Sequence, residues 1–272
     1  MRVLLFSKYG PRGASSRLRS YQYLPFLEKK GIQVDISTLF DDRYLELFFS
    51  GGQRNPLQVL RSYLNRAQRI GSLSSYDLLW IEYELFPWLP ATVENHIFRH
   101  GVPFIVDYDD AVFHRYDLNP SRLIRKLLGR KIDRIMRSAK AVIAGNRYLA
   151  HRAAAAGASQ VVQIPTVVDL TRYRCRSSRR GSNFTIGWIG TPHTDRYLHH
   201  IEPAVQEVAS RHRIQFMAVG AGECAFRGLS CKVLPWSEDN EAQTIATFDV
   251  GVMPLRDEPF ERGKCGYKLI QY

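Results

Sequence analysis

The sequence lacks the features that define several common classes of protein. No apolar run is long enough to span a bilayer, and the apolar stretch after Met1 is too short for a signal peptide. The four cysteines, Cys175, Cys224, Cys231 and Cys265, form no CxxC pair, which argues against a zinc site or a disulfide framework. No short repeat and no low-complexity tract is visible. These absences predict a cytoplasmic globular protein with reduced thiols.

Acidic residues are too few to balance the basic ones, because 38 Lys and Arg stand against 26 Asp and Glu and give a formal net charge of +12. Such an excess favours a partner that carries phosphate: nucleic acid, an anionic membrane surface or a nucleotide-type substrate. Nucleic-acid binding predicts aromatic residues interleaved with Lys and Arg on one face. The basic residues here are spread over helices and a connecting segment, so no nucleic-acid partner is expected.

Short apolar runs alternate with helical patterns along the first part of the chain, as in parallel sheets built from βαβ units. The predicted strands are 2–7, 33–38, 77–83, 103–108 and 139–145, and the predicted helices lie near 16–30, 56–71, 90–99, 119–137 and 147–156. The pattern then stops in a polar, basic stretch and resumes. The second series has strands at 184–190, 214–220, 231–236 and 249–255, with helices near 195–211 and 238–247.

The two series predict an α/β protein with two Rossmann-like, doubly wound domains. We expect an N-terminal domain at 1–165, a connection at 166–183 and a C-terminal domain at 184–272. The last helical pattern, at 267–272, has no stop signal such as a Gly after it. The second domain is therefore expected to be incomplete, and the chain to be an inactive fragment of a longer protein.

Ligands of open parallel sheets bind at the carboxyl ends of the strands, so the turns that follow strands are the candidate sites. After the first strand, Gly10 and Gly13 precede Ser15, Ser16 and Arg17 at the start of a helix. The backbone N–H groups there could hold an anion. The alternative is an ordinary turn in which Ser15 or Ser16 caps the helix.

The turn after the fourth strand gathers acidic residues. Asp107, Asp109, Asp110 and His114 lie within eight residues. Carboxylates so close together repel one another, and this repulsion destabilises the protein. Such a cluster therefore indicates a function: to bind a cation or sugar hydroxyls, or to supply a base. The alternative is that one Asp caps the next helix and His114 is an ordinary surface residue.

Two further turns belong to the second series. Gly190 and Thr191 follow its first strand, and a glycine-rich turn with three basic residues ends the chain. That last turn contains Arg262, Gly263, Lys264, Gly266 and Lys268. Backbone N–H groups and lysines that converge on a helix start are typical of a diphosphate site. The spacing is not the GxxxxGK[ST] of a P-loop.

The segments PFIVDYDDAVF, IPTVVD, FTIGWIGTPHT and GKCGYKL occur in an order that resembles the GT-B glycosyltransferases of family four, of the "glycosyl transferases group 1" type. The resemblance covers essentially the whole chain. It implies an acceptor site on the N-terminal domain and a nucleotide-sugar site on the C-terminal one. It also implies transfer with retention, no metal, no cofactor besides the sugar nucleotide, and a glycan or lipid-linked acceptor in bacterial surface polysaccharide or glycolipid synthesis.

The resemblance also implies roles for particular residues. Donor binding falls to Gly190, Thr191, Glu261, Arg262, Lys264, Cys265, Gly266, Tyr267, Lys268 and Gln271, and acceptor binding to Gly13, Ser15, Ser16, Arg17 and His114. Asp109, with Asp107 or Asp110 as the alternatives, is expected to orient hydroxyls in the catalytic cleft.

Two departures leave an alternative open. The family has two Glu residues, of which the first contacts the donor sugar and the second holds the ribose; here Gly263 stands at the first position and Gln271 at the second. Glu261 could replace the first, and the amide of Gln271 could bind the ribose. The alternative is a non-catalytic protein of the same fold that binds nucleotide or glycan.

The predicted helix 121–140 has apolar residues at helical spacing and Lys or Arg at much of the rest, among them Lys131. It could hold the protein at an anionic membrane surface. Alternatively it packs on the core and turns a solvated basic face outward.

Overall fold

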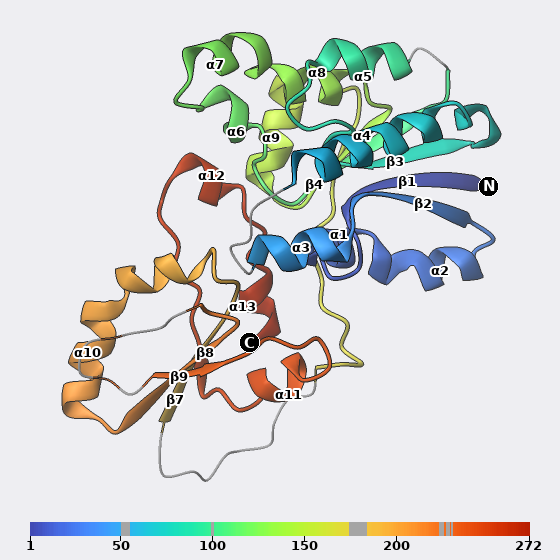
Figure 1. The fold of residues 1–272 in the computed structure, drawn as a ribbon. Helices are drawn as coiled ribbons and strands as arrows, with labels where there is room; N and C mark the ends of the chain where they lie inside the picture. The colour runs from blue at the N-terminus through green and yellow to red at the C-terminus, as the bar shows by residue number, and fades with distance from the viewer. Residues whose placement is uncertain (50–54, 99–100, 174–183, 223–225, 227–228, 230) are drawn as a thin grey trace. The chain divides into compact units, whose positions relative to one another are not determined.

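The computed structural model describes residues 1–49, 55–98, 101–173, 184–222, 226, 229 and 231–272 (Figure 1). These residues form an α/β protein with two parallel sheets, which confirms the predicted fold class. Unit 1 comprises Met1–Thr166 and Glu258–Cys265, and unit 2 comprises Val167–Asp257 and Gly266–Tyr272. The predicted connection lies largely outside the described residues, as do Cys175 and Cys224, while Cys265 is a free thiol.

Unit 1 contains a six-stranded parallel sheet in the order β2-β1-β3-β4-β5-β6. The strands are β1 (Arg2–Tyr9), β2 (Gln33–Phe40), β3 (Leu78–Glu82), β4 (Phe104–Tyr108), β5 (Ala141–Ala144) and β6 (Val161–Gln163). All five predicted strands are present. The sequence analysis missed β6 because three residues are too few for a periodic signal.

Helices cover both faces of this sheet (Figure 1). The helical elements of unit 1 are α1 (Ala14–Arg19), η1 (Tyr21–Tyr23), α2 (Leu24–Lys29), α3 (Asp42–Phe49), α4 (Pro56–Ile70), η2 (Leu73–Ser75), α5 (Ala91–Phe98), α6 (His114–Asp117), α7 (Arg122–Leu128), α8 (Lys131–Ser138), α9 (Arg147–Ala155) and α12 (Pro259–Arg262). On one face Phe6, Ile81 and Val106 pack in a core that includes α5, α8 and α9. On the other face Val3 and Trp80 pack against α2.

The prediction of a single basic helix at 121–140 is wrong, because the structure has two separate helices, α7 and α8, in this stretch. The break is at Gly129, where an added Cβ would lie 2.4 Å from the carbonyl oxygen of Arg125. Lys131, predicted to belong to the basic face, is 2% exposed and its Nζ lies 2.6 Å from Glu84 and 2.9 Å from Glu94. The sequence pattern could not separate a buried, ion-paired lysine from a solvated one.

Unit 2 contains a four-stranded parallel sheet in the order β10-β7-β8-β9. Its elements are β7 (Phe184–Ile189), η3 (Asp195–His200), α10 (Glu202–Arg211), β8 (Ile214–Val219), β9 (Cys231–Leu234), α11 (Glu241–Ile245), β10 (Val250–Gly251) and α13 (Tyr267–Gln271). Trp188 and Phe216 pack on the side of η3 and α10, and Ile189 and Met217 on the side of α11 and α13. The strand predicted at 249–255 is shorter than expected, since Pro254 has no N–H to continue a ladder.

Among the residues that the structure describes, no helix is both long and apolar enough to cross a membrane.

Candidate functional site

The strand order of unit 1 identifies the edge where chemistry is expected. The chain passes from β1 to β2 on one side, whereas β3 pairs with β1 on the other side. The connections therefore diverge between β1 and β3, and ligands of open α/β sheets bind at the carboxyl ends of the strands at such a point. Lys8 lies at that end of β1, and Glu82 and Tyr83 lie at that end of β3.

Glu82 is a site candidate that the sequence analysis missed. Its carboxylate is buried, and its Oε2 accepts hydrogen bonds from the Ser16 hydroxyl at 2.6 Å and from the Lys8 backbone N–H at 2.8 Å. Its Oε1 is buried and has no hydrogen-bond partner among the described residues. Burial raises the pKa of Glu82 to about 7. An acidic residue at the end of the apolar run LLWIE was the only available signal in the sequence.

Tyr83 links this group to the predicted aspartates. Its backbone has φ 63°, in the left-handed region that non-glycine residues rarely adopt. The Tyr108 hydroxyl donates to the Tyr83 carbonyl at 2.8 Å, and the Tyr83 hydroxyl donates to the Asp109 carboxylate. Such strained backbone persists only where surrounding contacts hold it, and it is common at functional sites. The result is a fixed orientation for Asp109.

The three predicted aspartates have different environments. Asp107 is buried and accepts two hydrogen bonds from Arg19, at 2.9 and 3.3 Å. Arg19 also donates to the Ile164 carbonyl at 2.7 Å, so this pair is committed within unit 1. Burial raises the pKa of Asp107, and the Arg19 guanidinium opposes that shift. An apolar cavity of about 270 Å³, lined in part by Trp80, lies beside the pair.

Asp110 faces a segment that is distant in the sequence. The Lys264 Nζ lies 3.4 Å from its carboxylate, and both belong to unit 1. Burial raises the pKa of Asp110, and Lys264 opposes the shift. Two of the three aspartates are therefore half-buried: Asp109, beside Tyr83, and Asp110, beside Lys264. Asp107 is buried.

The segment Glu258–Cys265 was predicted to lie in the second domain, and the structure groups it with unit 1. Asn146 donates to the carbonyls of Gly263, at 2.9 Å, and Lys264, at 3.1 Å. The Cys265 thiol donates to the Asp109 carbonyl at 3.1 Å, and burial raises its pKa to about 12. This thiol is therefore a packed, protonated group.

The residues predicted to bind the acceptor are mostly engaged within unit 1. Gly13 caps α1, so Ser15 and Ser16 are not the cap, and a Cβ on Gly13 would lie 2.4 Å from the Tyr9 Cβ. Ser16 is buried against Glu82, and Arg17 donates to the Pro11 carbonyl at 3.2 Å.

His114 is also engaged. One of its ring nitrogens lies 2.7 Å from Asp117 and the other 2.8 Å from the Tyr148 hydroxyl.

In unit 2 three predicted donor residues lie near β7. The Lys268 amine lies over the Trp188 ring, 4.6 Å from its centroid. A Cβ on Gly190 would lie 2.2 Å from that ring and 2.8 Å from the Lys268 Nζ, so only glycine fits there. The Thr191 N–H donates to the Thr194 hydroxyl at 3.1 Å. These contacts bring a lysine and a backbone turn together at the carboxyl end of β7.

The remaining donor candidates are divided between the units. Glu261 and Arg262 lie on α12 in unit 1, whereas Tyr267 begins α13 in unit 2 after Gly266, whose φ is 63°.

Gln271 is buried, and its amide nitrogen donates to the Tyr173 hydroxyl and to Glu241, at 2.6 Å each. Both of its N–H groups are thus used inside unit 2.

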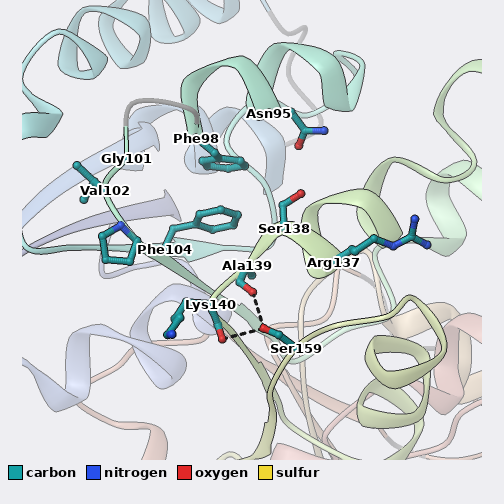
Figure 2. A pocket seen from close by; sticks show the side chains of 11 residues that line it. Asn95, Phe98, Gly101, Val102, Phe104, Arg137, Ser138, Ala139, Lys140 and Ser159 are labelled. Atoms are coloured by element: carbon teal, nitrogen blue, oxygen red, sulfur yellow. Dashed lines mark hydrogen bonds between the residues drawn. The ribbon is translucent and has the colours of Figure 1, made fainter.

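A larger cavity lies at the opposite edge of the first sheet. It has a volume of about 640 Å³, and its lining includes Phe98, Phe104, Arg137, Lys140 and Ser159. Phe104 begins β4 and Lys140 immediately precedes β5, so this is the amino edge. The charged ends of Arg137 and Lys140 extend away from each other (Figure 2). None of the predicted site residues lines this cavity.

No protein-family model matches the sequence, and no curated protein matches it either. Solved structures do match in fold. A glycosyltransferase from Rickettsia africae has 12% identity and a TM-score of 0.60, over 92% of this chain and 72% of that one. A UDP-GlcNAc 2-epimerase from Neisseria meningitidis, bound to UDP-GlcNAc, has 9% identity and a TM-score of 0.58, over 100% and 90%. An α,α-trehalose 6-phosphate synthase from Burkholderia multivorans has 13% identity and a TM-score of 0.55, over 94% and 78%.

These likenesses establish that the chain has the GT-B fold of glycosyltransferases and related epimerases, as the resemblance implied. At such low identity they show the fold alone.

Proposed function

We propose that this chain is a glycosyltransferase that moves a sugar from a nucleotide-sugar donor to a glycan or lipid-linked acceptor, with retention and without a metal, in bacterial surface polysaccharide or glycolipid synthesis. The observation that carries the proposal is the GT-B fold, whose solved examples include glycosyltransferases and an epimerase bound to UDP-GlcNAc. The cluster of Glu82, Tyr83 and Asp109 at the carboxyl edge of unit 1 supports it.

In this proposal unit 1 positions the acceptor. The Asp109 carboxylate, oriented by the Tyr83 hydroxyl, accepts a hydrogen bond from the acceptor hydroxyl that attacks the donor sugar. Glu82 holds the loop after β1 through Ser16 and the Lys8 backbone. Asp107 is a positioning residue, since Arg19 occupies both of its oxygens.

Unit 2 holds the donor in this proposal. Lys268, beside Gly190 and Thr191, neutralises the diphosphate as the nucleotide departs, because charge that develops on a leaving group is best stabilised by fixed cations and N–H groups. The sequence predicts the same task for Lys264, which lies in unit 1 beside Asp110.

We also propose that α7 contacts an anionic membrane surface that carries the acceptor. Leu123 and Leu127 are 64% and 59% exposed on this helix. They lie four residues apart, hence on the same face. Arg122, Arg125 and Lys126 are exposed beside them.

The experiment that tests the proposed function is a calorimetric titration of UDP, GDP and ADP. We expect one nucleotide to bind, with affinity reduced on the order of tenfold or more in Lys268→Ala and Lys264→Ala, because each variant loses a charge-assisted contact. Lys232→Ala, which removes an exposed lysine of unit 2, is the matched control. Absence of binding by all three nucleotides to the folded protein would contradict the donor site.

Analysis of the products then distinguishes the related functions. Transfer of the sugar to an added acceptor is the expected outcome. Binding of nucleotide sugar without any turnover would favour the non-catalytic alternative, and conversion of the nucleotide sugar without transfer would favour an epimerase-like activity.

A further inference from the structure

The smaller cavity of unit 1, of about 270 Å³, is lined by α2 on one side and by the six-stranded sheet on the other. Three neighbouring strands contribute to its floor. Trp80 of β3 pairs in register with Ile105 of β4, and Asp107 of β4 pairs with Ile143 of β5. Leu27 lines it from α2. Because paired residues of a sheet point to the same face, these four strand residues face one space.

This space exists because α2 covers the sheet incompletely. None of the six residues of α2 is fully buried. On the sheet side, Leu78, Ile105 and Ile143 are only half-buried, although strands of a parallel sheet are usually buried on both faces. Apolar side chains of both elements therefore line a cavity instead of packing against each other.

The lining determines which kind of ligand fits. Its side chains are aliphatic or aromatic apart from Arg19 and Asp107. Those two are engaged, since Arg19 donates two hydrogen bonds to Asp107 and one to the Ile164 carbonyl at 2.7 Å. A sugar or a nucleotide in this cavity would bury hydroxyls or phosphates without partners, which is unfavourable. Cavities lined by aliphatic and aromatic side chains bind hydrocarbon instead.

The cavity extends along the strands toward the candidate site. It reaches from Leu78, the first residue of β3, to Asp107, which pairs with Glu82, the last residue of β3. With a rise of about 3.3 Å per residue, this strand is roughly 13 Å long. Asp107 precedes Asp109, the residue proposed to orient the acceptor hydroxyl, by two positions. A ligand that fills the cavity therefore ends close to the proposed point of transfer.

We propose that this cavity holds the hydrocarbon chain of the sugar acceptor. This inference rests on the proposed function and names the class of its acceptor: a lipid-linked sugar, not a free glycan. The chain lies against Trp80, Ile105 and Ile143, and the sugar at its end lies at Asp109. The cavity is accessible at this end, because Ile164, which lines it, is 42% exposed.

The experiment is an NMR titration with hexyl, octyl and decyl glucoside, each below its critical micelle concentration, and with methyl glucoside as the same sugar without a long chain. Affinity should rise about fourfold for each added CH₂, the usual gain from burying one such group. Methyl glucoside should bind more weakly than decyl glucoside by on the order of a hundredfold or more. The methyl signals of Ile105 and Ile143 should shift on binding.

Two variants fill the cavity. Ile105→Trp and Ile143→Trp should each reduce the affinity for decyl glucoside on the order of tenfold or more, because the indole occupies the space of the chain. Neither should lower the free energy of unfolding, since the larger side chain enters a cavity and not a packed core. Leu60→Trp, at a 55% exposed position of α4 outside this cavity, is the matched control and should leave the affinity unchanged.

Several outcomes would overturn the inference. They are absence of decyl glucoside binding to the folded wild-type protein, affinity that does not depend on chain length, and equal affinity of wild type and both cavity variants. Shifts confined to Leu123 and Leu127 would overturn it too, because the chain would then lie on α7. Should the variants not fold, the wild-type complex decides: nuclear Overhauser contacts between the chain and the methyl groups of Ile105 and Ile143 are expected, and their absence would overturn the inference.

Titration of UDP, GDP and ADP in parallel separates this inference from the proposed function. Nucleotide binding without decyl glucoside binding would overturn the inference alone. Decyl glucoside binding without nucleotide binding would contradict the proposed donor site.

Discussion

At the scale of single residues, burial decides what the charged groups of unit 1 can do. Glu82 is 3% exposed, and its two oxygens differ: Oε2 has two donors, whereas Oε1 has none among the described residues. Desolvation therefore dominates its ionisation, and the neutral acid is favoured up to about pH 7. The unfolded chain ionises the same group near its ordinary pKa of about 4.3.

This difference predicts a pH-dependent stability. Because the folded-state pKa is raised, the folded protein binds more protons than the unfolded chain between about pH 4.3 and 7, and its stability falls as the pH rises through that window. Glu82→Gln has no such proton. The free energy of unfolding of the variant, relative to wild type, should therefore increase by on the order of 2–3 kcal/mol between pH 5 and pH 8.

Urea unfolding at both pH values measures this change. Any constant loss from hydrogen bonds altered by the substitution cancels in the comparison of the two pH values. Glu28→Gln, at an exposed carboxylate of α2, should show no such change. Equal differences at pH 5 and pH 8 for Glu82→Gln would mean that Glu82 is not desolvated.

Some of the residue-level site was predictable and some was not. The DYDD cluster indicated the right edge of the right sheet, because residues after a parallel strand must lie at its carboxyl end. The separation of Asp107 from Asp109 and Asp110 depends on Arg19, which is 88 residues away in the sequence. For Glu82 the sequence held only a weak signal, an acidic residue at the end of an apolar run, since a single carboxylate in a strand acquires its properties from burial.

At the scale of elements, the region of α7 and α8 illustrates how period alone misleads. Apolar residues recur at helical spacing through the whole stretch, but Gly129 allows the chain to turn between the helices. As a result the two helices have different roles. α8 packs Ile132, Ile135 and Met136 into the core, whereas α7 leaves Leu123 and Leu127 exposed.

The proposed membrane contact is tested on α7 itself. In Leu123→Ser/Leu127→Ser, binding to vesicles that contain anionic lipid should fall on the order of tenfold or more, because two partly exposed leucines lose apolar burial. Leu57→Ser/Leu64→Ser provides the matched control on α4, with exposed leucines of 74% and 55%. Sedimentation with the vesicles measures binding.

Two results of that measurement would contradict the proposal. One is equal binding by wild type and the α7 variant. The other is a larger loss in the α4 variant, which would assign the contact to α4.

At the scale of the whole molecule, alternation of strands and helices was enough to predict two α/β units, because each buried parallel strand and each amphipathic helix leaves a strong period. What the sequence could not indicate was the route of the chain near its end. Val167–Asp257 and Gly266–Tyr272 belong to unit 2, whereas Glu258–Cys265, which lies between them in the sequence, belongs to unit 1. That route depends on side-chain contacts of Asn146, Asp110 and Cys265, which no periodic pattern records.

Asn146 holds this segment while it also caps α9. Its carbonyl oxygen accepts from the Leu149 N–H at 3.0 Å, and its amide nitrogen donates to the carbonyls of Gly263 and Lys264. Asn146→Asp keeps the cap, since a carboxylate is an equally good acceptor at a helix start. The substitution removes the two hydrogen bonds that the amide donates and places a carboxylate oxygen opposite two carbonyl oxygens. The segment Glu258–Cys265 should therefore detach more often from the rest of unit 1.

Limited trypsin digestion reads this opening directly, because Arg262 and Lys264 are cleavage sites in the segment. Loss of two hydrogen bonds, each about 1 kcal/mol, should increase the initial rate of cleavage after these residues on the order of tenfold or more. Asn55→Asp is the matched control, because Asn55 caps α4 by accepting from the Leu57 N–H at 2.9 Å and should leave the rate unchanged. An Asn146→Asp rate equal to wild type would mean that the other contacts, Lys264 with Asp110 and Cys265 with the Asp109 carbonyl, suffice to keep the segment on unit 1.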